Sequence, residues 1–353
     1  MRGIAIGASN LRAPIVVDAH NDLLMLVDHF RGDPAFFGRQ LLPQLRAGQV
    51  GVQLLPVYIE EQWVPEMALR RTLELIEQAH RVVEASPDDL LLCLDRDDID
   101  LALADGRIGI VLALEGCAAI GNDVDLLQTM HRLGVRVGSL THFGRNGLAE
   151  GSAEGIPGGR LSRVGARAIE TMERVGIVVD VSHLSLASTR HVLELVSKPV
   201  IASHSCADAL VAHHRNLPDD ELRAIAATGG VIGVNFFPPF LSSSGTATVA
   251  DVIAHIEHIA GVTGIDHVGL GPDFTKELAM TLYPEPRPVV EGVDLASAVV
   301  GIEGPADLPV IADELAKRGF DDAAVRAVMG GNFIRVLREL MEPPTFTAAA
   351  GGA

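Results

Sequence analysis

Short apolar runs alternate along this chain with longer amphipathic stretches, and this alternation restricts the fold more than any other feature. Each run is bounded by Gly, Pro or a helix-ending signal, as a buried strand is. A strand followed by a helix, repeated along a chain, is the βα unit of a parallel sheet. The eight runs that we interpret as strands are Ile15–Val17, Val50–Ile59, Ile108–Leu114, Val135–Leu140, Gly176–Val181, Pro199–Ala202, Gly230–Phe236 and His267–Leu270.

Helical patterns follow most of these runs. Six of them lie at Pro65–Ala85, Val124–Leu133, Leu161–Val175, Leu186–Val196, Asp219–Ala227 and Val249–Thr263. Between Asp273 and Pro309 the chain is Pro-rich, and we expect irregular structure there. Two further patterns, Asp307–Arg318 and Asp321–Leu340, then predict helices that close the fold.

Eight strands with intervening helices favour a closed (β/α)₈ TIM barrel over an open doubly wound sheet, and no GxGxxG motif follows the first run. We expect one α/β domain over residues 1–353, with a disordered tail at 343–353. Hydrophobic residues make up 48% of the chain but aromatic ones only 4%, so Val, Ile, Leu and Ala must build the core. A buried parallel sheet has this composition.

Charge and cysteine content restrict the partners and the compartment. The formal net charge of −18, with no stripe of Lys and Arg, disfavours nucleic acid and anionic membrane surfaces as partners. The three cysteines, Cys93, Cys117 and Cys206, are too few and too scattered for a disulfide framework. Residues 1–10 hold no sustained apolar segment of the kind a secretion signal needs. We therefore expect a cytoplasmic protein.

The end of the first strand carries metal-ligand residue types. Because strand side chains alternate, Asp18, His20 and Asp22 share one face. An imidazole and a carboxylate at this spacing converge on one ion where the strand ends. Asp18, one pleat further back, suits a partner that orients His20. A His-x-Asp triplet is common by chance, so it needs support from other strands.

Glu115 ends the third strand, after a run of apolar residues, and Gly116 follows it. A carboxylate buried there without a partner would have a strongly raised pKa or would destabilise the barrel. A buried arginine or a metal ion are the two partners that would prevent this. The glycine permits a sharp turn at the carboxyl end of the strand, which is where barrel active sites lie.

Further polar residues end other strands at the same rim. His183 and His204 follow the fifth and sixth strands, Thr141-His142 follows the fourth, and Asp273 follows the eighth. A single histidine at such a place is more often a satisfied core residue, but two at equivalent ends of adjacent strands indicate ligands. A catalytic zinc takes three protein ligands, so this larger set indicates a site for two metal ions.

The positions of the lysines indicate which residue could bridge two metal ions. Many two-metal barrels use a carboxylated lysine, but the only lysines here are Lys198, Lys276 and Lys317, and none ends a middle strand. Glu115 is therefore the residue that we expect to bridge the ions.

In combination, these segments resemble the renal (membrane) dipeptidase family of metallopeptidases, peptidase family M19, in a bacterial-type form. The resemblance extends over nearly the whole chain, from residue 18 to residue 336. The matching segments are DAHND at 18–22, LEG at 114–116, LTH at 140–142, DVSH at 180–183, ASHS at 202–205, RNLPDD at 215–220, GPDF at 271–274 and GNFIRV at 331–336.

The resemblance implies a role for each matching residue. One zinc ion would be held by His20 and Asp22, the other by His183 and His204, with Glu115 bridging both. It also implies that His142 contacts the oxygen of the tetrahedral intermediate, that Arg215 binds the substrate carboxylate and that Asp273 transfers the proton. Two positions depart from the family pattern: Thr275 replaces the second Asp of Asp-Phe-Asp-Gly, and Phe240 replaces a substrate-side tyrosine. These departures bear on which substrate is bound, because the ligands are unchanged.

The expected function is therefore hydrolysis of a dipeptide with a free C-terminal carboxylate, by water that two divalent ions activate. The expected partner is a small-molecule dipeptide, and a homodimer is compatible with the sequence. An N-acyl amino acid deacylase or a lactonase on the same site is the first alternative. A non-catalytic barrel that keeps its metals structurally is the second, and it would leave Asp273 and His142 without a task.

Overall fold

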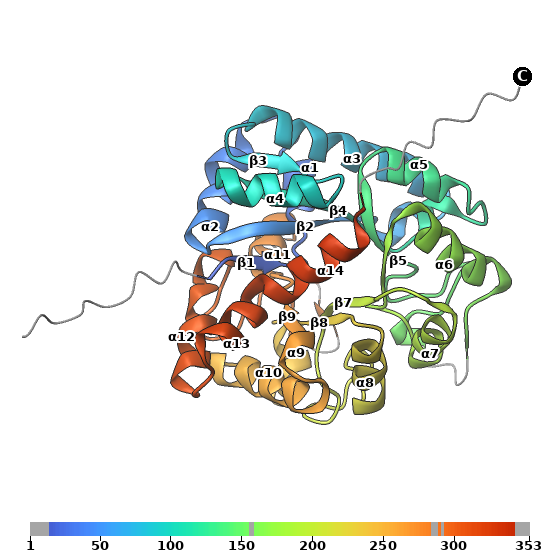
Figure 1. Ribbon diagram of the computed structural model, residues 1–353. Coiled ribbons are helices and arrows are strands. Elements are labelled where there is room, and N and C mark those ends of the chain that lie inside the picture. Colours follow the sequence, from blue (N-terminus) through green and yellow to red (C-terminus); the bar gives the residue numbers. More distant parts are fainter. Residues whose placement is uncertain (1–13, 155–158, 284–288, 291–292, 343–353) are drawn as a thin grey trace, which may run out of the picture.

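The computed structural model describes residues 14–154, 159–283, 289–290 and 293–342. Its main sheet is a parallel barrel in which each of the eight runs above contributes one strand, so the predicted (β/α)₈ class is confirmed (Figure 1). In order around the barrel the strands are β1 (Val16–Asp18), β2 (Val50–Tyr58), β4 (Ile108–Glu115), β5 (Val135–Ser139), β6 (Val178–Asp180), β7 (Ile201–Ser205), β8 (Val231–Val234) and β9 (Val268–Leu270).

The barrel closes between its first and last strands. The backbone N–H of Ala19 donates to the carbonyl oxygen of Leu270 at 3.1 Å, and that of Asp273 donates to the carbonyl oxygen of His20 at 2.9 Å. Both hydrogen bonds lie at the carboxyl ends of β1 and β9. They bring the segments after these strands, which carry His20 and Asp273, side by side.

One short strand was not predicted. β3 (Leu90–Leu92) pairs with Ile108–Ile110 at the start of β4, while β5 pairs with the later residues Leu112–Leu114 of the same strand. The helix after it, α4 (Arg96–Asp105), was also missed, although Asp95 caps it by accepting hydrogen bonds from the backbone N–H groups of Asp97 and Asp98. Three apolar residues are too few to show a period, so only the pairing with β4 identifies the strand.

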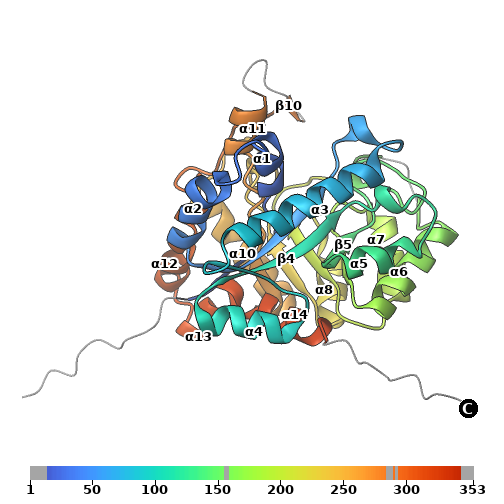
Figure 2. The ribbon, with the colours of Figure 1, turned by 90° about the horizontal axis from the view of Figure 1, so that it is seen from above.

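Helices surround the strands, and most of them cover the outer face of the barrel (Figures 1 and 2). They are α1 (Leu23–His29), α2 (Leu42–Ala47), α3 (Ala68–Ala85), α5 (Leu126–Arg132), α6 (Arg163–Val175), α7 (Leu186–Leu195), α8 (Asp219–Ala227), α9 (Pro238–Leu241), α10 (Val249–Thr263), α11 (Lys276–Leu282), α12 (Pro309–Lys317), α13 (Asp322–Arg326) and α14 (Asn332–Leu340). The six helices predicted between strands are all present, with starts shifted by at most three residues.

Two regions differ from the sequence prediction. The stretch between Asp273 and Pro309, expected to be irregular, contains α11 and the two-stranded pair β10 (Val289–Val290) and β11 (Val293–Asp294). The closing pattern Asp321–Leu340 is divided by a π-helical turn, Ala327–Gly331, between α13 and α14. The expected tail at 343–353 lies outside the described residues.

α14 closes the amino end of the barrel. The side-chain amide of Asn332 donates to the carbonyl oxygens of Ile265, in the turn before β9, and of Val268, the first residue of β9. Phe333, the next residue, is fully buried. A Cβ atom on Gly269 would lie 2.5 Å from the Phe333 ring, so only glycine admits this packing. The opposite, carboxyl end of the barrel is therefore the end available for a site.

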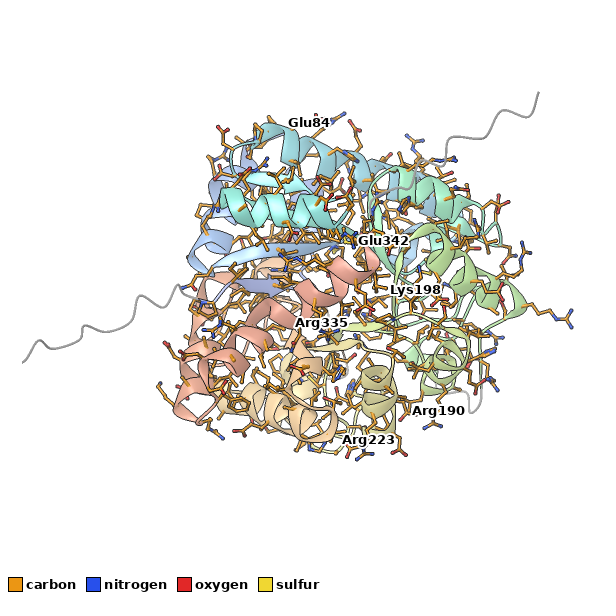
Figure 3. The ribbon with its side chains drawn as sticks, in the orientation of Figure 1. Glu84, Arg190, Lys198, Arg223, Arg335 and Glu342 are labelled. Carbon is orange, nitrogen blue, oxygen red and sulfur yellow. The ribbon has the colours of Figure 1, made fainter. Side chains whose placement is uncertain are left out.

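Many charged side chains lie on the outer surface of the helices. Exposed side chains such as Glu84, Arg190 and Arg223 point outward from the helices (Figure 3). Among the described residues, no helix combines the length and the apolar character that spanning a membrane would require.

Candidate metal centre

The side chains predicted to bind metal or to act in catalysis lie together at the carboxyl end of the barrel. Glu115 is the last residue of β4, His204 lies near the end of β7, and the others follow their strands within a few residues. The set brought together is His20, Asp22, Glu115, His142, His183, His204 and Asp273.

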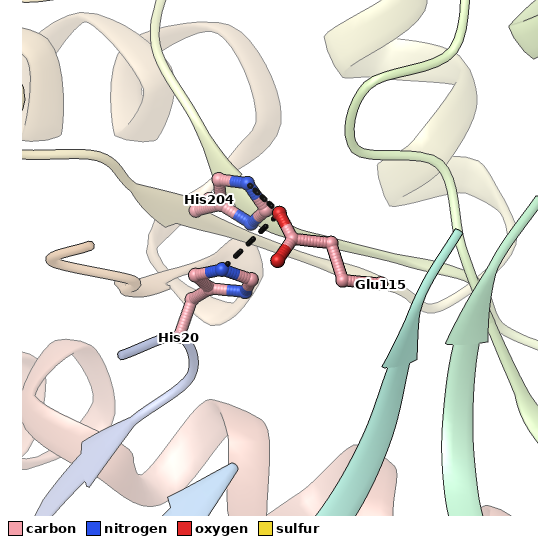
Figure 4. A group of neighbouring side chains, drawn as sticks. All are labelled: His20, Glu115 and His204. Carbon is pink, nitrogen blue, oxygen red and sulfur yellow. Dashed lines mark ion pairs between the residues drawn. The ribbon is translucent and has the colours of Figure 1, made fainter. Parts of the chain in front are cut away.

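The Glu115 carboxylate lies at the centre of this set. Its Oε1 atom is 3.0 Å from Nε2 of His183, 3.4 Å from Nε2 of His20, 3.8 Å from Nε2 of His204 and 3.9 Å from Nε2 of His142. Figure 4 shows His20 and His204 facing the carboxylate from one side. Residues from five separate strands thus meet at one carboxylate.

Three overlapping groups of these residues could each hold a cation, because their ligand atoms all lie within 4.8 Å of one another. The groups are His20 with Glu115 and His204, Glu115 with His142 and His183, and His20 with Asp22 and Asp273. Glu115 and His20 each belong to two groups, and of these two the carboxylate, with its two oxygens, is the one that can bridge two cations.

The polar atoms at the centre of the site have the chemistry of a metal site. His20 Nε2, Asp22 Oδ1 and Glu115 Oε2 are buried and have no hydrogen-bond partner in the described part of the chain. Buried polar atoms in proteins are nearly always satisfied, and a cation would satisfy all three. Imidazole and carboxylate ligands suit zinc and similar divalent ions, so the residues present fit such an ion.

Burial and mutual charge set the protonation of the cluster. Burial opposes ionisation of Glu115, but the His20 and His183 imidazoles outweigh it and hold the pKa of this carboxyl well below its usual range. Burial lowers the pKa of His183 and of His204 well below the ordinary value, and that of His142 to about 4. These three histidines are therefore neutral near pH 7, which is the form that ligates a metal or donates a single N–H.

Two of the site residues have strained backbones. His183 has φ of 69° and Asp273 has φ of 55°, in the left-handed region that non-glycine residues rarely occupy. Backbone hydrogen bonds hold both: Ser152 N–H donates to the His183 carbonyl at 2.7 Å, and Asp273 N–H donates to the His20 carbonyl. Such strain costs about 1–3 kcal/mol and persists at functional sites where the surroundings fix it.

A hydrogen-bonded chain behind His204 fixes its orientation. The Asp180 carboxylate accepts hydrogen bonds from the backbone N–H groups of Ser182 and Ser203 and from the Ser203 hydroxyl. Because that hydroxyl donates its one proton to Asp180, it accepts from Nδ1–H of His204, which lies 2.7 Å away. The Nε2 lone pair of His204 is thereby left to face the cluster, where Nε2 of His183 lies 2.7 Å away and Oε1 of Glu115 3.8 Å away.

Asp18 supports His20 in a different way from the one expected. Its carboxylate accepts a hydrogen bond from the backbone N–H of His20 at 3.1 Å and one from the Asn21 amide at 3.3 Å. Asp18 therefore positions His20 through the backbone N–H. In the described part of the chain it accepts no hydrogen bond from the imidazole.

Arg215 lies beside the cluster as a buried cation. Its Nη2 atom donates to the carbonyl oxygen of His204 at 3.2 Å, and its guanidinium lies 5.9 Å from the Phe143 ring centre and 5.6 Å from that of Phe240. Its Nε atom is buried without a hydrogen-bond partner among the described residues. Phe240, where the family pattern led us to expect a tyrosine, therefore contacts the side chain that was expected to read the substrate carboxylate.

The structure adds two residues that sequence reasoning missed. Asn235, just after β8, donates from its amide to Oδ2 of Asp273 at 3.0 Å. Tyr58, the last residue of β2, places its ring 4.7 Å from the His142 ring. Their positions at the ends of barrel strands could have indicated them from the sequence. They were missed because neither Asn nor Tyr is a preferred metal ligand.

The departure at Thr275 lies outside the metal cluster. Thr275 immediately precedes α11, and the adjacent Lys276 forms an ion pair with Glu303 at 2.6 Å. The lysine therefore does not provide a cation to the cluster.

Comparison with known proteins places this geometry in a family. The sequence profile of the membrane dipeptidases, peptidase family M19, matches residues 9–282. This chain belongs to that family. A curated relative, the dipeptidase aclJ of Aspergillus oryzae, is 32% identical over 93% of this chain and 78% of its own length. Family M19 enzymes are metallopeptidases, so the chain is a hydrolase that acts on peptide bonds, and its expected divalent metal agrees with the cluster around Glu115.

Solved structures share the fold. An amidohydrolase from Pseudomonas aeruginosa superposes with a TM-score of 0.78 at 26% identity, covering 93% of this chain and 97% of the other. A metallopeptidase from Rhodobacter sphaeroides, solved with a phosphinate mimic of the dipeptide L-Ala-D-Ala, gives a TM-score of 0.82 at 23% identity, covering 94% of this chain and all of the other.

Proposed function

We propose that this chain is a dipeptidase that holds two divalent ions, most simply zinc, and cleaves dipeptides with a free C-terminal carboxylate. The observation that carries the proposal is the position of Glu115, whose Oε1 atom lies 3.4 Å from Nε2 of His20 and 3.0 and 3.8 Å from those of His183 and His204. In the proposed arrangement His20 and Asp22 hold one ion, His183 and His204 hold the other, and Glu115 binds both.

Bound ions of this kind would lower the pKa of a water molecule and polarise the substrate carbonyl. The chain's own residues move the protons and orient the peptide. Asp273, held at Oδ2 by the Asn235 amide, accepts the proton from the attacking water and passes it to the departing amine. His142, neutral because burial lowers its pKa, donates an N–H hydrogen bond to the oxygen that becomes negatively charged.

Arg215 supports the choice of a short peptide with a free carboxyl end. A guanidinium buried between two aromatic rings has lost its water shell, and a carboxylate can take the place of that water through paired hydrogen bonds. Because Arg215 also binds the backbone of the ligand His204, a carboxylate at its guanidinium lies within one or two residues of the metal cluster. This distance suits a substrate with one residue on the C-terminal side of the cleaved bond, as a dipeptide has.

The proposal is tested with the metal-loaded protein and a panel of matched substrates: free dipeptides, the same dipeptides with an amidated C-terminus, and N-acetylated amino acids. We expect hydrolysis of the free dipeptides, loss of activity with a chelator and recovery with zinc. Activity confined to acylated amino acids would assign the chain to the deacylases. Bound metal without hydrolysis of any amide would indicate a structural role for the metal.

Arg215→Ala tests the carboxylate contact. We expect KM for free dipeptides to rise about tenfold or more, because a charge-assisted hydrogen bond is lost, while the slow turnover of amidated dipeptides changes little. Equal effects on the free and amidated peptides would remove Arg215 from carboxylate recognition.

A further inference from the structure

A cavity of about 220 Å³ lies next to the metal cluster, on the side of β2. Its wall is formed by α1, the end of β2, the segment after β2, α3 and the end of α11. Tyr58 belongs to both places, because it lines the cavity and its ring packs 4.7 Å from that of His142. The Glu115 and Asp22 carboxylates are also near enough to raise the pKa of Tyr58, after burial itself.

The cavity lies opposite Arg215 across the barrel. Counted around the barrel from β1, β2 is the second strand and β7 is the sixth, so they are separated by half of the circle. Arg215 follows β7 and binds the carbonyl oxygen of His204. A dipeptide whose carboxylate binds Arg215 and whose amide lies at Glu115 must therefore direct its N-terminal residue towards β2 and the cavity. Ligand pockets for whole small molecules are usually about 300–1,000 Å³, so this volume suits one side chain.

The wall is rich in aromatic rings and carries charges of both signs, because Arg71 also lines it, with its guanidinium 5.7 Å from the Trp63 ring centre. It contains the two tyrosines of the chain, Tyr58 and Tyr283, and its single tryptophan, Trp63. Two carboxylates also line it, and their charges are balanced differently. Asp28 forms ion pairs with Arg71 at 2.6 Å and with Arg31 at 3.0 Å.

Glu60 lacks such a balance. Among the described residues, the side chain of Glu60 accepts hydrogen bonds from two neutral groups, the Trp63 indole N–H and the Tyr283 hydroxyl, each at 3.2 Å. Within the part of the chain that the structure describes, it forms no ion pair with a lysine, arginine or histidine. Glu60 is thus a half-buried carboxylate, held by the Trp63 indole and the Tyr283 hydroxyl, whose charge no cation pairs within the described residues. Of the aromatic rings in the wall, Trp63 already contacts Arg71, and a further cation can contact the tyrosine rings.

From these observations we infer that the cavity is the binding site for the side chain of the N-terminal residue, and that Glu60 selects a cationic one, arginine or lysine. The inference rests on the proposed dipeptidase function and adds a substrate class to it. The apolar stem of the side chain packs against the rings, and its charged end pairs with Glu60.

The test compares arginyl-alanine with citrullyl-alanine, because citrulline has nearly the shape of arginine but no charge. Both C-terminal configurations of alanine are used. We expect the wild-type holoenzyme to prefer arginine by about tenfold in kcat/KM, and Glu60→Gln to bring the two substrates to within about twofold. The glutamine oxygen can still accept from the Trp63 indole N–H, and its amide N–H can donate to the Tyr283 hydroxyl. Glu61→Gln, which alters the exposed neighbouring carboxylate, is the matched control and should keep the preference.

Trp63 provides a second measurement that does not depend on turnover. In the metal-loaded Asp273→Asn variant, its fluorescence should change on titration with arginyl-alanine, at concentrations about tenfold lower than with citrullyl-alanine.

Three outcomes would overturn the inference. They are equal hydrolysis of both substrates by the wild type, an arginine preference that Glu60→Gln leaves unchanged, and an equal loss of kcat/KM for both substrates in Glu60→Gln. The last would place Glu60 at the α-amine common to all dipeptides. Each of these leaves the dipeptidase proposal intact. Failure of the holoenzyme to cleave any dipeptide would instead remove the proposed function, and this inference with it.

Discussion

The residues of the candidate site lie together because each lies at or just after the end of a barrel strand. Glu115 is buried because β4 is buried throughout its length, and it is at the rim because it is the last residue of that strand. The same reasoning from sequence located His183, His204 and Asp273. It missed Asn235 and Tyr58, because their residue types carry no signal for metal binding, and their contacts with Asp273 and His142 arise only across the barrel.

Replacement of Asp273 separates proton transfer from metal binding. Asp273→Asn should keep the bound metal and lower kcat by a factor of about 10² to 10⁴, because an amide cannot accept the proton. Metal content by elemental analysis and kcat on one dipeptide are the two measurements. Asp266→Asn, on an exposed residue before β9, is the control. A fall in metal content would make Asp273 a ligand and contradict its assigned role.

The chain of hydrogen bonds behind His204 predicts a second effect on metal binding. Ser203→Ala removes the acceptor for His204 Nδ1–H and should weaken metal binding by about ten- to a hundredfold, as losses behind a metal ligand typically do. Competition with a chelator measures the affinity, and the visible spectrum of the cobalt-substituted protein reports the ligand geometry. Ser203→Thr, which keeps the hydroxyl, should restore both, and Ser197→Ala is a surface control. An unchanged cobalt spectrum and affinity in Ser203→Ala would exclude this role.

At the scale of secondary structure elements, strand pairing identifies elements that are too short to show a sequence period. The helices α8 and α10 begin and end where the pattern predicted, since each has a long amphipathic period. β3 has only three residues and is defined by its pairing with β4. α10 also joins two other elements through His255, whose Nδ1 accepts from the backbone N–H of Ala207 after β7 and whose Nε2–H donates to the carbonyl oxygen of Leu241 in α9.

This contact predicts a pH dependence of stability. Burial lowers the pKa of His255 to about 4, from an ordinary value of 6.5. The native state then binds fewer protons at this residue than the unfolded state, so its contribution is complete above pH 6.5 and is lost as the pH falls towards 4. Over that window the slope is at most about 1.4 kcal/mol per pH unit.

Denaturation of the wild type and of His255→Gln at several pH values measures this contribution. Glutamine can make both hydrogen bonds without titrating, so the free energy of unfolding of the variant should fall less steeply below pH 6.5. Parallel curves for the two proteins would show that His255 does not contribute.

At the scale of the whole molecule, the site connects strands from every side of the barrel. His20 follows β1, Glu115 ends β4, and His204 lies in β7. A cation bound by all of them would hold together elements that otherwise meet only through the core. α14 closes the other end with apolar packing around Phe333, and no ion is needed there.

Metal removal should therefore lower thermal stability without unfolding the barrel. A ligand present at a thousand times its Kd stabilises the native state by about 4 kcal/mol, so chelation should lower the melting temperature by several degrees. Calorimetry measures the shift, and far-ultraviolet circular dichroism should stay unchanged at room temperature. A melting temperature that is the same with and without bound metal would contradict a site that joins these strands.

The sequence by itself determined the alternation of strands and helices, the barrel class and the residue types that end most strands. It could do so because a side chain's face follows from the local period of the backbone, which needs no knowledge of distant residues. Tertiary structure alone decided how closely Glu115 approaches each imidazole, that Asp18 holds His20 through its backbone, that His183 and Asp273 adopt left-handed backbones, and that Glu60 shares a cavity with Tyr58. These features depend on barrel closure and on loops from separate strands, whose distances no local pattern records.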